Sequence, residues 1–375
     1  MTTPFSLLVK PVGAACNLAC DYCFYLDKAA LYPDGPAVMP REVMEQMVSS
    51  YLALPFDSHS IAFQGGEPLL AGIDFFKDVA SAVRRHSRPN AKVHLSIQTN
   101  ATLMTRQMAE FLAGEGWLAG VSVDGPAELH DRHRRSAAGE GSHADVMRGI
   151  DLLRRAGAEF NVLCLATSDS LECPGAIYRY LRDEIGARWH QYSQRLGDIT
   201  TEQWDGFLCG ILDAWASDGD AGRVFVRNIE DTLAYVRTGI ATQCIFGERC
   251  DGHVVVERNG DVYPCDFFVA EGTRLGNIME TGWQGLRSSP NARVRAAGKC
   301  PRHLSKIGSM RFYERCAAAV TQERAPPVRG HAGGTRTPAR ASASRTAFDR
   351  GMPCASAVTA ATTGRGPPVR GHAGA

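Results

Sequence analysis

The sequence feature that most constrains this chain is the segment CNLACDYC, which places Cys16, Cys20 and Cys23 at C-x3-C-x2-C spacing near the N-terminus. Iron–sulfur clusters are held by cysteine thiolates, usually four to a cluster. Three close thiols without an obvious fourth therefore predict a four-iron cluster with one iron open to a small molecule. A zinc knuckle and three unrelated thiols are the alternatives. Zinc sites usually pair two C-x2-C units or add histidines, and this segment has neither.

The length and composition of the chain exclude several classes of protein. Its 375 residues exceed one average domain, and 41 Lys plus Arg against 40 Asp plus Glu give no broad attraction to nucleic acid. The N-terminus lacks a basic stretch followed by an apolar run, and no apolar run reaches the roughly 18 residues of a membrane helix. Twelve cysteines in this context predict a reduced, metal-rich cytoplasmic protein that binds neither nucleic acid nor a membrane.

Strand and helix signals alternate through the first half of the chain. Apolar runs and alternation predict strands, and amphipathic spacing predicts helices between them. The strands are expected at residues 7–9, 60–63, 93–97, 121–123, 160–165 and 189–192, and the helices at residues 40–51, 75–85, 105–115, 146–155 and 177–184. Six such units in succession imply a parallel sheet covered by helices, and a partial (β/α)6 barrel fits this order.

Polar segments follow three of these strands, at the point where each strand ends. They are residues 64–67, 98–100 and 122–126. Chemistry in such barrels gathers at the carboxyl ends of the strands, and the glycine pair at 65–66 lets the backbone approach a ligand closely. Each segment alone could be an ordinary turn. Their shared position favours a binding surface for cofactor and substrate at this end of the barrel.

The cysteine motif, the aromatic pair Phe24 and Tyr25 behind it, and Gly-Gly-Glu-Pro about 40 residues later together resemble the radical S-adenosylmethionine (SAM) superfamily. In that superfamily the open iron binds the amino and carboxylate groups of SAM. The reduced cluster then cleaves SAM to methionine and a 5′-deoxyadenosyl radical. The resemblance implies the partial barrel, a [4Fe-4S] cluster on the three cysteines, and SAM-binding positions at Tyr22, Gln64, Gly65, Gly66, Glu67, Ser122, Arg134 and Leu196.

Arg134 is the candidate for the SAM carboxylate, because a guanidinium can contact a carboxylate with two nitrogens at once. Arg135 is the fallback for the same role. The chain departs from the superfamily pattern after the sixth strand, where Ser193, Gln194 and Arg195 stand in place of an apolar residue and proline. This departure concerns the substrate side of the site.

A second cysteine group, Cys244, Cys250 and Cys265, follows a predicted helical linker at residues 197–243. Between the last two cysteines, residues 254–257 and 261–263 flank Asn259-Gly260, a strong hairpin signal. The C-x5-C-x14-C spacing and the string YPCDFF resemble the SPASM domain of radical SAM peptide maturases. The resemblance is closest to the anaerobic sulfatase-maturating enzymes.

Those enzymes oxidise a cysteine or serine of a sulfatase polypeptide to Cα-formylglycine. The resemblance implies this activity here, with a sulfatase polypeptide as substrate and flavodoxin or ferredoxin as reductant. It also implies that Asp266, next to the cluster ligand Cys265, is the proton acceptor. The alternative for Asp266 is a hydrogen-bonded turn residue. The sequence does not distinguish a cysteine-type from a serine-type substrate.

The C-terminal part departs from the pattern that the resemblance implies. Where C-x2-C-x5-C-x3-C is expected, the chain has Ile307, Met310, Cys316 and Val320. Isoleucine and valine cannot ligate iron, and methionine replaces a thiolate poorly. We therefore expect one auxiliary [4Fe-4S] cluster that includes Cys244, Cys250 and Cys265, and the lost thiols argue against a second. The fourth ligand of the one expected auxiliary cluster would have to come from Cys316, Cys300 or Cys354.

The sequence divides into four parts. We expect the barrel at residues 1–196, the linker at 197–243, a degenerate SPASM-like domain at 244–320, and a low-complexity tail at 321–375. The tail repeats PPVRGHAG and lacks hydrophobic periodicity, which predicts disorder. It is either a lineage-specific extension or a frameshifted end. Two alternatives to the maturase remain, another SPASM peptide- or protein-modifying enzyme and a catalytically impaired remnant.

Overall fold

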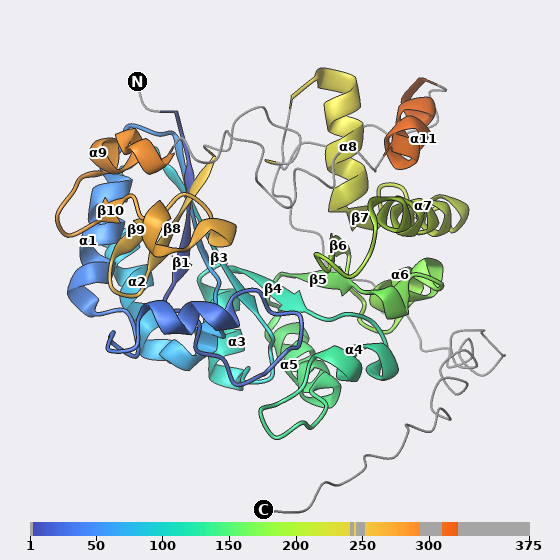
Figure 1. Ribbon diagram of the computed structural model, residues 1–375, viewed down its shortest axis with the longest axis horizontal. Helices are drawn as coiled ribbons and strands as arrows, with labels where there is room; N and C mark the ends of the chain where they lie inside the picture. The colour runs from blue at the N-terminus through green and yellow to red at the C-terminus, as the bar shows by residue number, and fades with distance from the viewer. Residues whose placement is uncertain (1–2, 241–243, 245–251, 293–309, 322–375) are drawn as a thin grey trace, which may run out of the picture. The chain divides into compact units, whose positions relative to one another are not determined.

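The computed structural model describes residues 3–240, 244, 252–292 and 310–321 (Figure 1). Several sequence predictions lie outside these residues. They are the ligand role of Cys250, the alternative fourth ligands Cys300 and Cys354, the missing thiol at Ile307, and the disorder of the tail beyond Thr321.

Six parallel strands form the centre of one sheet, as the sequence predicts. They pair in chain order, with Leu7 opposite Ile61 and Ile97 opposite Ala119 as examples of the register. The strands are β1 Ser6–Lys10, β2 Ser58–Phe63, β3 Lys92–Thr99, β4 Leu118–Ser122, β5 Phe160–Ala166 and β6 Trp189–Gln194. The helices between them are α1 Arg41–Leu52, α2 Ile73–His86, α3 Arg106–Gly114, α4 Ala127–His133, α5 His143–Ala156 and α6 Pro174–Asp183. The predicted strand–helix order is confirmed.

The helices pack on the sheet through stripes of apolar side chains. In α1, Val43, Met47 and Tyr51 recur every fourth residue and all three are buried, because positions four apart lie on one face of a helix. Inside the core, Phe63 of β2 stacks on Trp117 at a ring separation of 5.5 Å. These contacts fix β1 to β4 against α1 to α3, and so they fix the loops at the carboxyl ends of those strands.

The predicted hairpin is present, but it does not stand apart from the barrel. Its strands are β8 His253–Glu257 and β9 Asp261–Tyr263, and β10 Gly276–Asn277 pairs with β9. β8 lies parallel to β1, with Ser6 opposite His253 and Lys10 opposite Glu257. No local pattern in the sequence predicts this pairing. It makes the second cysteine region a continuation of the sheet that carries the first (Figure 1).

Three helices form a separate layer beyond β6. They are α7 Thr201–Ser217 and α8 Arg227–Thr238, which follows the short edge strand β7 Phe225–Val226, and α11 Met310–Thr321. α11 packs against both α7 and α8. Asp205 of α7 is buried, and its carboxylate accepts hydrogen bonds from the Phe312 backbone N–H and from Arg311 Nε, both at 3.0 Å. Asp205 thus satisfies a backbone donor near the start of α11.

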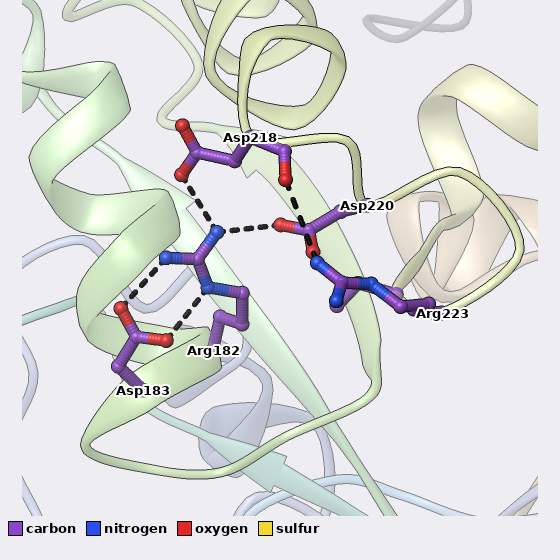
Figure 2. Close-up of a pocket in the computed structure, with 6 residues that line it drawn as sticks. Arg182, Asp183, Asp218, Asp220 and Arg223 are labelled. Carbon is purple, nitrogen blue, oxygen red and sulfur yellow. Dashed lines mark hydrogen bonds and ion pairs between the residues drawn. The ribbon is translucent and has the colours of Figure 1, made fainter.

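A pocket between the ends of α6 and α7 is lined by charged side chains (Figure 2). Arg182 contacts Asp218 and Asp220, at 2.6 and 2.5 Å, and Arg223 contacts Asp220 at 2.6 Å. Tyr178 also donates a hydrogen bond to Asp220. The acidic groups of this pocket already pair with its arginines, and these contacts hold the ends of α6 and α7 together. We therefore do not regard the pocket as a candidate active site. None of the described helices is both long enough and apolar enough to cross a membrane.

Candidate active site

The loop that follows β1 carries Cys16, Cys20 and Cys23, all partly buried. The Leu18 backbone N–H lies 3.4 Å from Cys16 Sγ, and Asn100 Nδ2 lies 3.8 Å from the same sulfur. Hydrogen bonds to ligand sulfurs are one of the ways in which a protein tunes an iron–sulfur cluster. The loop is held in turn by the segment after α4, since the Ala19 N–H donates to the Arg135 carbonyl at 2.7 Å.

The three thiols share one loop, with the backbone N–H of Leu18 and the side chain of Asn100 directed at Cys16 Sγ. A cluster would place each thiolate on a different iron. Burial raises the pKa of Cys16, and it raises the pKa of Cys20 to about 11. A metal centre would supply the positive charge that keeps such buried thiols deprotonated.

The Gly-Gly-Glu-Pro segment after β2 holds this loop in place. Gly66 has φ of +51°, and a Cβ there would lie 1.9 Å from the Ala15 carbonyl oxygen. Glu67 is fully buried, and its own N–H donates to that carbonyl at 2.8 Å. Its carboxylate accepts hydrogen bonds from Thr99 Oγ1 and from the Asn100 N–H, both at 2.7 Å. Burial raises the pKa of Glu67 to about 7.

Glu67 therefore ties the cysteine loop to the end of β3. Both carboxylate oxygens accept hydrogen bonds from the protein itself, so the side chain of Glu67 positions the loops, and the predicted SAM contact of this segment would fall to its backbone groups. Asn100 continues the network, because its Nδ2 donates to Asn17 Oδ1 at 2.9 Å, and Asn17 donates to Thr102 at 2.8 Å. Asn17 was not recognised in the sequence. Its place inside the CNLACDYC segment was the available signal.

Arg134 and Tyr22 converge on one buried carboxylate at the end of β4. Arg134 Nε and Nη2 donate to Asp124 at 2.8 and 3.2 Å, and the Tyr22 hydroxyl donates to the same side chain. Burial alone would raise the pKa of Asp124, but the Arg134 charge holds it below its usual value. The Nη1 nitrogen of Arg134 takes no part in this pair. Arg134 also lies near Cys20, since its charge acts on the pKa of that thiol.

The other predicted SAM positions lie around the carboxyl ends of the strands. Ser122 is buried and accepts a hydrogen bond from Gln98 Nε2 at 3.0 Å. Gln64 follows β2 directly, and its N–H donates to the Val9 carbonyl at 2.9 Å. Leu196 lies in the turn after β6 and is 38% exposed. Gly65 has φ of +128°, and a Cβ there would meet Lys10 Cδ at 2.2 Å.

Lys10 is a buried lysine that was not recognised in the sequence as part of the site. Its side chain is 1% exposed, and Nζ lies 4.2 Å from the centre of the Tyr25 ring. Burial lowers the pKa of Lys10, while the charges of Asp266 and Glu257 act to raise it. The Tyr25 hydroxyl donates a hydrogen bond to Glu257. A lysine at the end of an apolar strand, directly before the cysteine loop, was the sequence signal for this residue.

The second cysteine region packs directly against the first. Phe24 stacks on Phe267 with ring centres 4.7 Å apart and planes 20° apart. Phe267 belongs to the short helix η4 Asp266–Phe268, which follows Cys265. Lys10 lies near both regions, because Cys23, Cys265 and Asp266 are all close enough to act on its pKa. The structure thus brings the predicted proton acceptor into the neighbourhood of the predicted cluster loop.

The predicted ligands of the auxiliary cluster lie in different surroundings. Among the described residues, Cys265, Asp266 and His253 gather within 4.8 Å, and Cys316 is not part of that group. Cys316 is fully buried in α11, the helix that packs on α7 and α8, where its thiol lies near that of Cys209 of α7. Burial raises the pKa of Cys316 to about 12. Cys244 is exposed.

Comparison with known proteins agrees with this geometry. Residues 11–180 match the radical SAM superfamily, and residues 244–316 match the SPASM iron-sulfur cluster-binding domain. A serine-type anaerobic sulfatase-maturating enzyme of Bacteroides thetaiotaomicron is 35% identical over 302 residues, covering 73% of this chain and 72% of the relative. A cysteine-type enzyme of Clostridium perfringens is 35% identical over 291 residues, covering 74% and 78%. The chain belongs to the anaerobic sulfatase-maturating enzyme family.

Solved structures of this family support the assignment. Native anSMEcpe with bound AdoMet matches with a TM-score of 0.77 at 28% identity, covering 86% of this chain and 99% of the other. The same protein with AdoMet and the Cp18Cys peptide matches with a TM-score of 0.76 at 28% identity, covering 86% and 100%. As a family member, the chain is a radical SAM oxidoreductase. The family implies a [4Fe-4S] cluster with SAM and a SPASM domain for auxiliary clusters.

Proposed function

We propose that this protein oxidises a cysteine or serine of a sulfatase polypeptide to Cα-formylglycine. The observation that carries the proposal is the packing of the Cys265–Asp266 segment against the Cys16–Cys23 loop through Lys10 and the Phe24–Phe267 stack. The reaction needs a hydrogen-atom acceptor and a proton acceptor at the same substrate residue, and this packing brings candidates for both into one neighbourhood. Relatives at 35% identity carry the serine-type and cysteine-type activities in their names.

The first half of the site would hold the cofactors. Cys16, Cys20 and Cys23 would bind the [4Fe-4S] cluster, which with SAM supplies a 5′-deoxyadenosyl radical for removal of a hydrogen atom from the substrate Cβ. Arg134 would contact the SAM carboxylate through the nitrogen that Asp124 leaves unengaged. Tyr22, Gln64, Gly65, Gly66, Glu67, Ser122 and Leu196 would form the rest of the SAM surface, Glu67 through its backbone while its side chain positions the loops. A flavodoxin or ferredoxin would reduce the cluster, in a reducing cytoplasm.

The second half of the site would accept the proton and the remaining electron. Asp266 would take the proton from the substrate thiol or hydroxyl. Together with loss of the hydrogen atom and one electron, this would leave the aldehyde directly from serine, and from cysteine a thioaldehyde that water would hydrolyse to the aldehyde with release of hydrogen sulfide. Its position next to Cys265, with Sγ and Oδ1 3.2 Å apart, supports a path in which the proton and the electron leave together. An auxiliary [4Fe-4S] cluster on Cys244, Cys250 and Cys265 would take the electron. Cys316 is a poor fourth ligand, because it is buried in the layer that α11 forms with α7 and α8.

A second candidate function is a weakened maturase, which the substitutions at 307, 310 and 320 favour. Such a protein would still cleave SAM, because the N-terminal half of the site keeps its residues. It would oxidise peptide slowly, because the electron acceptor is incomplete. Replacement of the three residues by cysteine, as Ile307→Cys, Met310→Cys and Val320→Cys, should then raise the iron content and the rate of peptide oxidation together.

The test uses anaerobically reconstituted full-length protein with reductant, SAM and peptides that contain C-x-P-x-R or S-x-P-x-R. Mass spectrometry should detect formylglycine in at least one peptide and 5′-deoxyadenosine in the same reaction. Asp266→Asn should stop peptide oxidation and leave SAM cleavage intact, because an amide cannot accept the proton. Asp74→Asn, a substitution of a 91% exposed carboxylate, is the matched control and should retain both activities.

The outcomes separate the candidates. SAM cleavage with no formylglycine in either peptide would contradict the proposal, and slow conversion that the three cysteines accelerate would support the weakened maturase. If Asp266→Asn keeps full peptide oxidation, another group must accept the proton.

A further inference from the structure

Lys10 stands out among the lysines of this chain because it is buried. It is 1% exposed, and no other lysine is buried among the residues that the structure describes. Lysine is almost never fully buried unless its charge has a partner, because removal of a charge from water costs free energy. The reaction proposed above assigns Lys10 no chemical step, although the residue lies at the end of β1, directly before the cysteine loop.

Three contacts hold the Lys10 side chain in place. Its Nζ lies 4.2 Å from the centre of the Tyr25 ring, a distance at which a cation is attracted to the aromatic face. Gly65 leaves room for the aliphatic part, since a Cβ there would lie 2.2 Å from Lys10 Cδ. The parallel pairing of β1 with β8 sets Glu257 beside Lys10. The glycine of the Gly-Gly-Glu-Pro segment is thus one condition for burial of this lysine.

The strand register places Lys10 on the face of the sheet that carries both cysteine regions. Glu257 is the strand partner of Lys10, and Val255, two residues before it, points to the same face. Val255 lies opposite Tyr263, and the two side chains share one buried apolar cluster. Cys23 packs against that cluster. The Lys10 side chain therefore shares this face with the cysteine loop and with the end of β9.

The groups around Lys10 are acidic. Burial lowers the pKa of Lys10, whereas the charges of Asp266, Glu257, Cys265 and Cys23 all act to raise it. A [4Fe-4S] cluster with its thiolate ligands is itself negatively charged, and a further electron makes it more so. Net charge is one of the properties that set the reduction potential of such a cluster. A fixed positive charge nearby stabilises the reduced form more than the oxidised form.

We propose that the buried ammonium of Lys10 raises the reduction potential of the cluster on the Cys16–Cys23 loop. It thereby favours transfer of one electron from a reduced flavodoxin or ferredoxin to that cluster, with no bond made or broken. The inference rests on the proposed function, which places the cluster on this loop. Lys10 acts through its charge and is neither a cluster ligand nor a SAM contact.

The test is a potentiometric titration of reconstituted full-length protein, carried out without oxygen and followed by electron paramagnetic resonance. The signal that changes on addition of SAM identifies the N-terminal cluster. Four proteins are compared: the natural chain, Lys10→Met, Lys10→Gln, and the control Lys92→Met, whose lysine is exposed at the start of β3. Methionine keeps most of the aliphatic length without the charge, and glutamine keeps a polar group without the charge.

Both Lys10 variants should shift the equilibrium between oxidised and reduced cluster about tenfold toward the oxidised form. For a one-electron couple, this lowers the midpoint potential by about 59 mV. Lys92→Met should keep the midpoint potential of the natural chain. The iron content should be equal in all four proteins, because none of the substitutions removes a ligand.

The rate of SAM cleavage supplies a second readout. It is measured with reduced flavodoxin and with titanium(III) citrate, a stronger reductant, and the first rate is divided by the second. This ratio should fall severalfold in both Lys10 variants, because the weaker reductant is more sensitive to the potential of the cluster. A structural defect would lower both rates by the same factor and leave the ratio unchanged.

Two results would overturn the proposal. One is a natural midpoint potential in both Lys10 variants. The other is loss of the cluster from both variants, as measured by iron content, which would give Lys10 a structural role. No peptide is used in these measurements. Formylglycine formation with an unchanged potential would therefore contradict only this inference, and a lowered potential without formylglycine formation by the natural chain would contradict only the proposed function.

Discussion

Substitution of Gly66 by alanine should disrupt the cluster loop selectively. Gly66 has φ of +51°, a left-handed conformation that costs an L-residue about 1–2 kcal/mol. The added Cβ would also lie 1.9 Å from the Ala15 carbonyl oxygen, which is a backbone atom next to Cys16 and the acceptor of the Glu67 N–H. Overpacking of this kind costs a further 1–3 kcal/mol, roughly. The total loss in the free energy of unfolding is therefore about 2–5 kcal/mol.

Gly157→Ala is the matched control for this substitution. Gly157 ends α5 in the left-handed region, with φ of 70° and ψ of 23°, and its Cβ would meet nothing within 4 Å. Gly157→Ala should lower the free energy of unfolding only by the conformational cost, about 1–2 kcal/mol. Thermal unfolding measures the losses of both variants, since each kcal/mol lowers the midpoint by roughly 2–4 °C in a domain of this size.

The functional readout is SAM cleavage together with iron content. Gly66→Ala should lose both, because the collision moves the segment that leads into Cys16, whereas Gly157→Ala should keep both. Equal thermal midpoints and equal SAM cleavage in the two variants would refute the claim that the glycine pair positions the cysteine loop.

Three further predictions follow from particular contacts. Arg134→Lys should weaken SAM binding by roughly tenfold to a hundredfold, because a lysine cannot hold Asp124 and contact the SAM carboxylate at the same time. Equilibrium binding of SAM measures this loss. Arg106→Lys, a substitution at an 84% exposed position, is the control. Asp205→Ala should lower the free energy of unfolding by about 1–2 kcal/mol, because α11 loses a buried acceptor for a backbone N–H. Asp213→Ala, which removes only the exposed ion pair to Arg315, should cost at most about 1 kcal/mol, and equal losses would show that Asp205 has no special role. His130 and His190 should contribute a loss of stability as the pH drops below about 6.5, because burial lowers their pKa values to about 4. Glu67, whose pKa burial raises to about 7, contributes in the opposite direction. Between pH 6.5 and 4 the two histidines bind more protons in the unfolded chain than in the folded chain, so each histidine contributes stability that is present above pH 6.5 and lost on acidification, about 1 kcal/mol by pH 5.5. Urea unfolding at several pH values measures this slope, which His190→Gln should reduce; an unchanged slope would contradict the assignment of the acid sensitivity to buried histidines.

Local patterns made much of the fold predictable from the sequence. Residues 93–97 alternate apolar and polar positions and form β3, and the Asn259-Gly260 pair forms the turn between β8 and β9. Gly260 has φ of +87°, a conformation that glycine adopts at little cost. The cysteine spacing likewise indicated the cluster loop without reference to distant residues.

Long-range pairing was the part that the sequence did not reveal. β8 joins β1 across about 247 positions, and no local pattern in His253–Glu257 specifies β1 as its partner. The same holds for Lys10, whose burial depends on Gly65, Tyr25 and Glu257, and for Asp205, whose acceptor role depends on the arrival of α11. The motif around Glu67 predicts a cofactor contact for this segment, whereas the second role of its side chain, joining the cysteine loop to the end of β3, depends on hydrogen-bond partners that are distant in the sequence.

The measurement that tests the central claim most directly follows one hydrogen atom. A sulfatase-derived peptide is synthesised with deuterium on the Cβ of its target cysteine or serine, and it is incubated with reconstituted protein, reductant and SAM. If the Cys16–Cys23 loop and the Cys265–Asp266 segment serve one reaction, the 5′-deoxyadenosine should carry the deuterium and the peptide should carry formylglycine. Formylglycine formed with unlabelled 5′-deoxyadenosine, or labelled 5′-deoxyadenosine with an unrelated peptide product, would contradict the account.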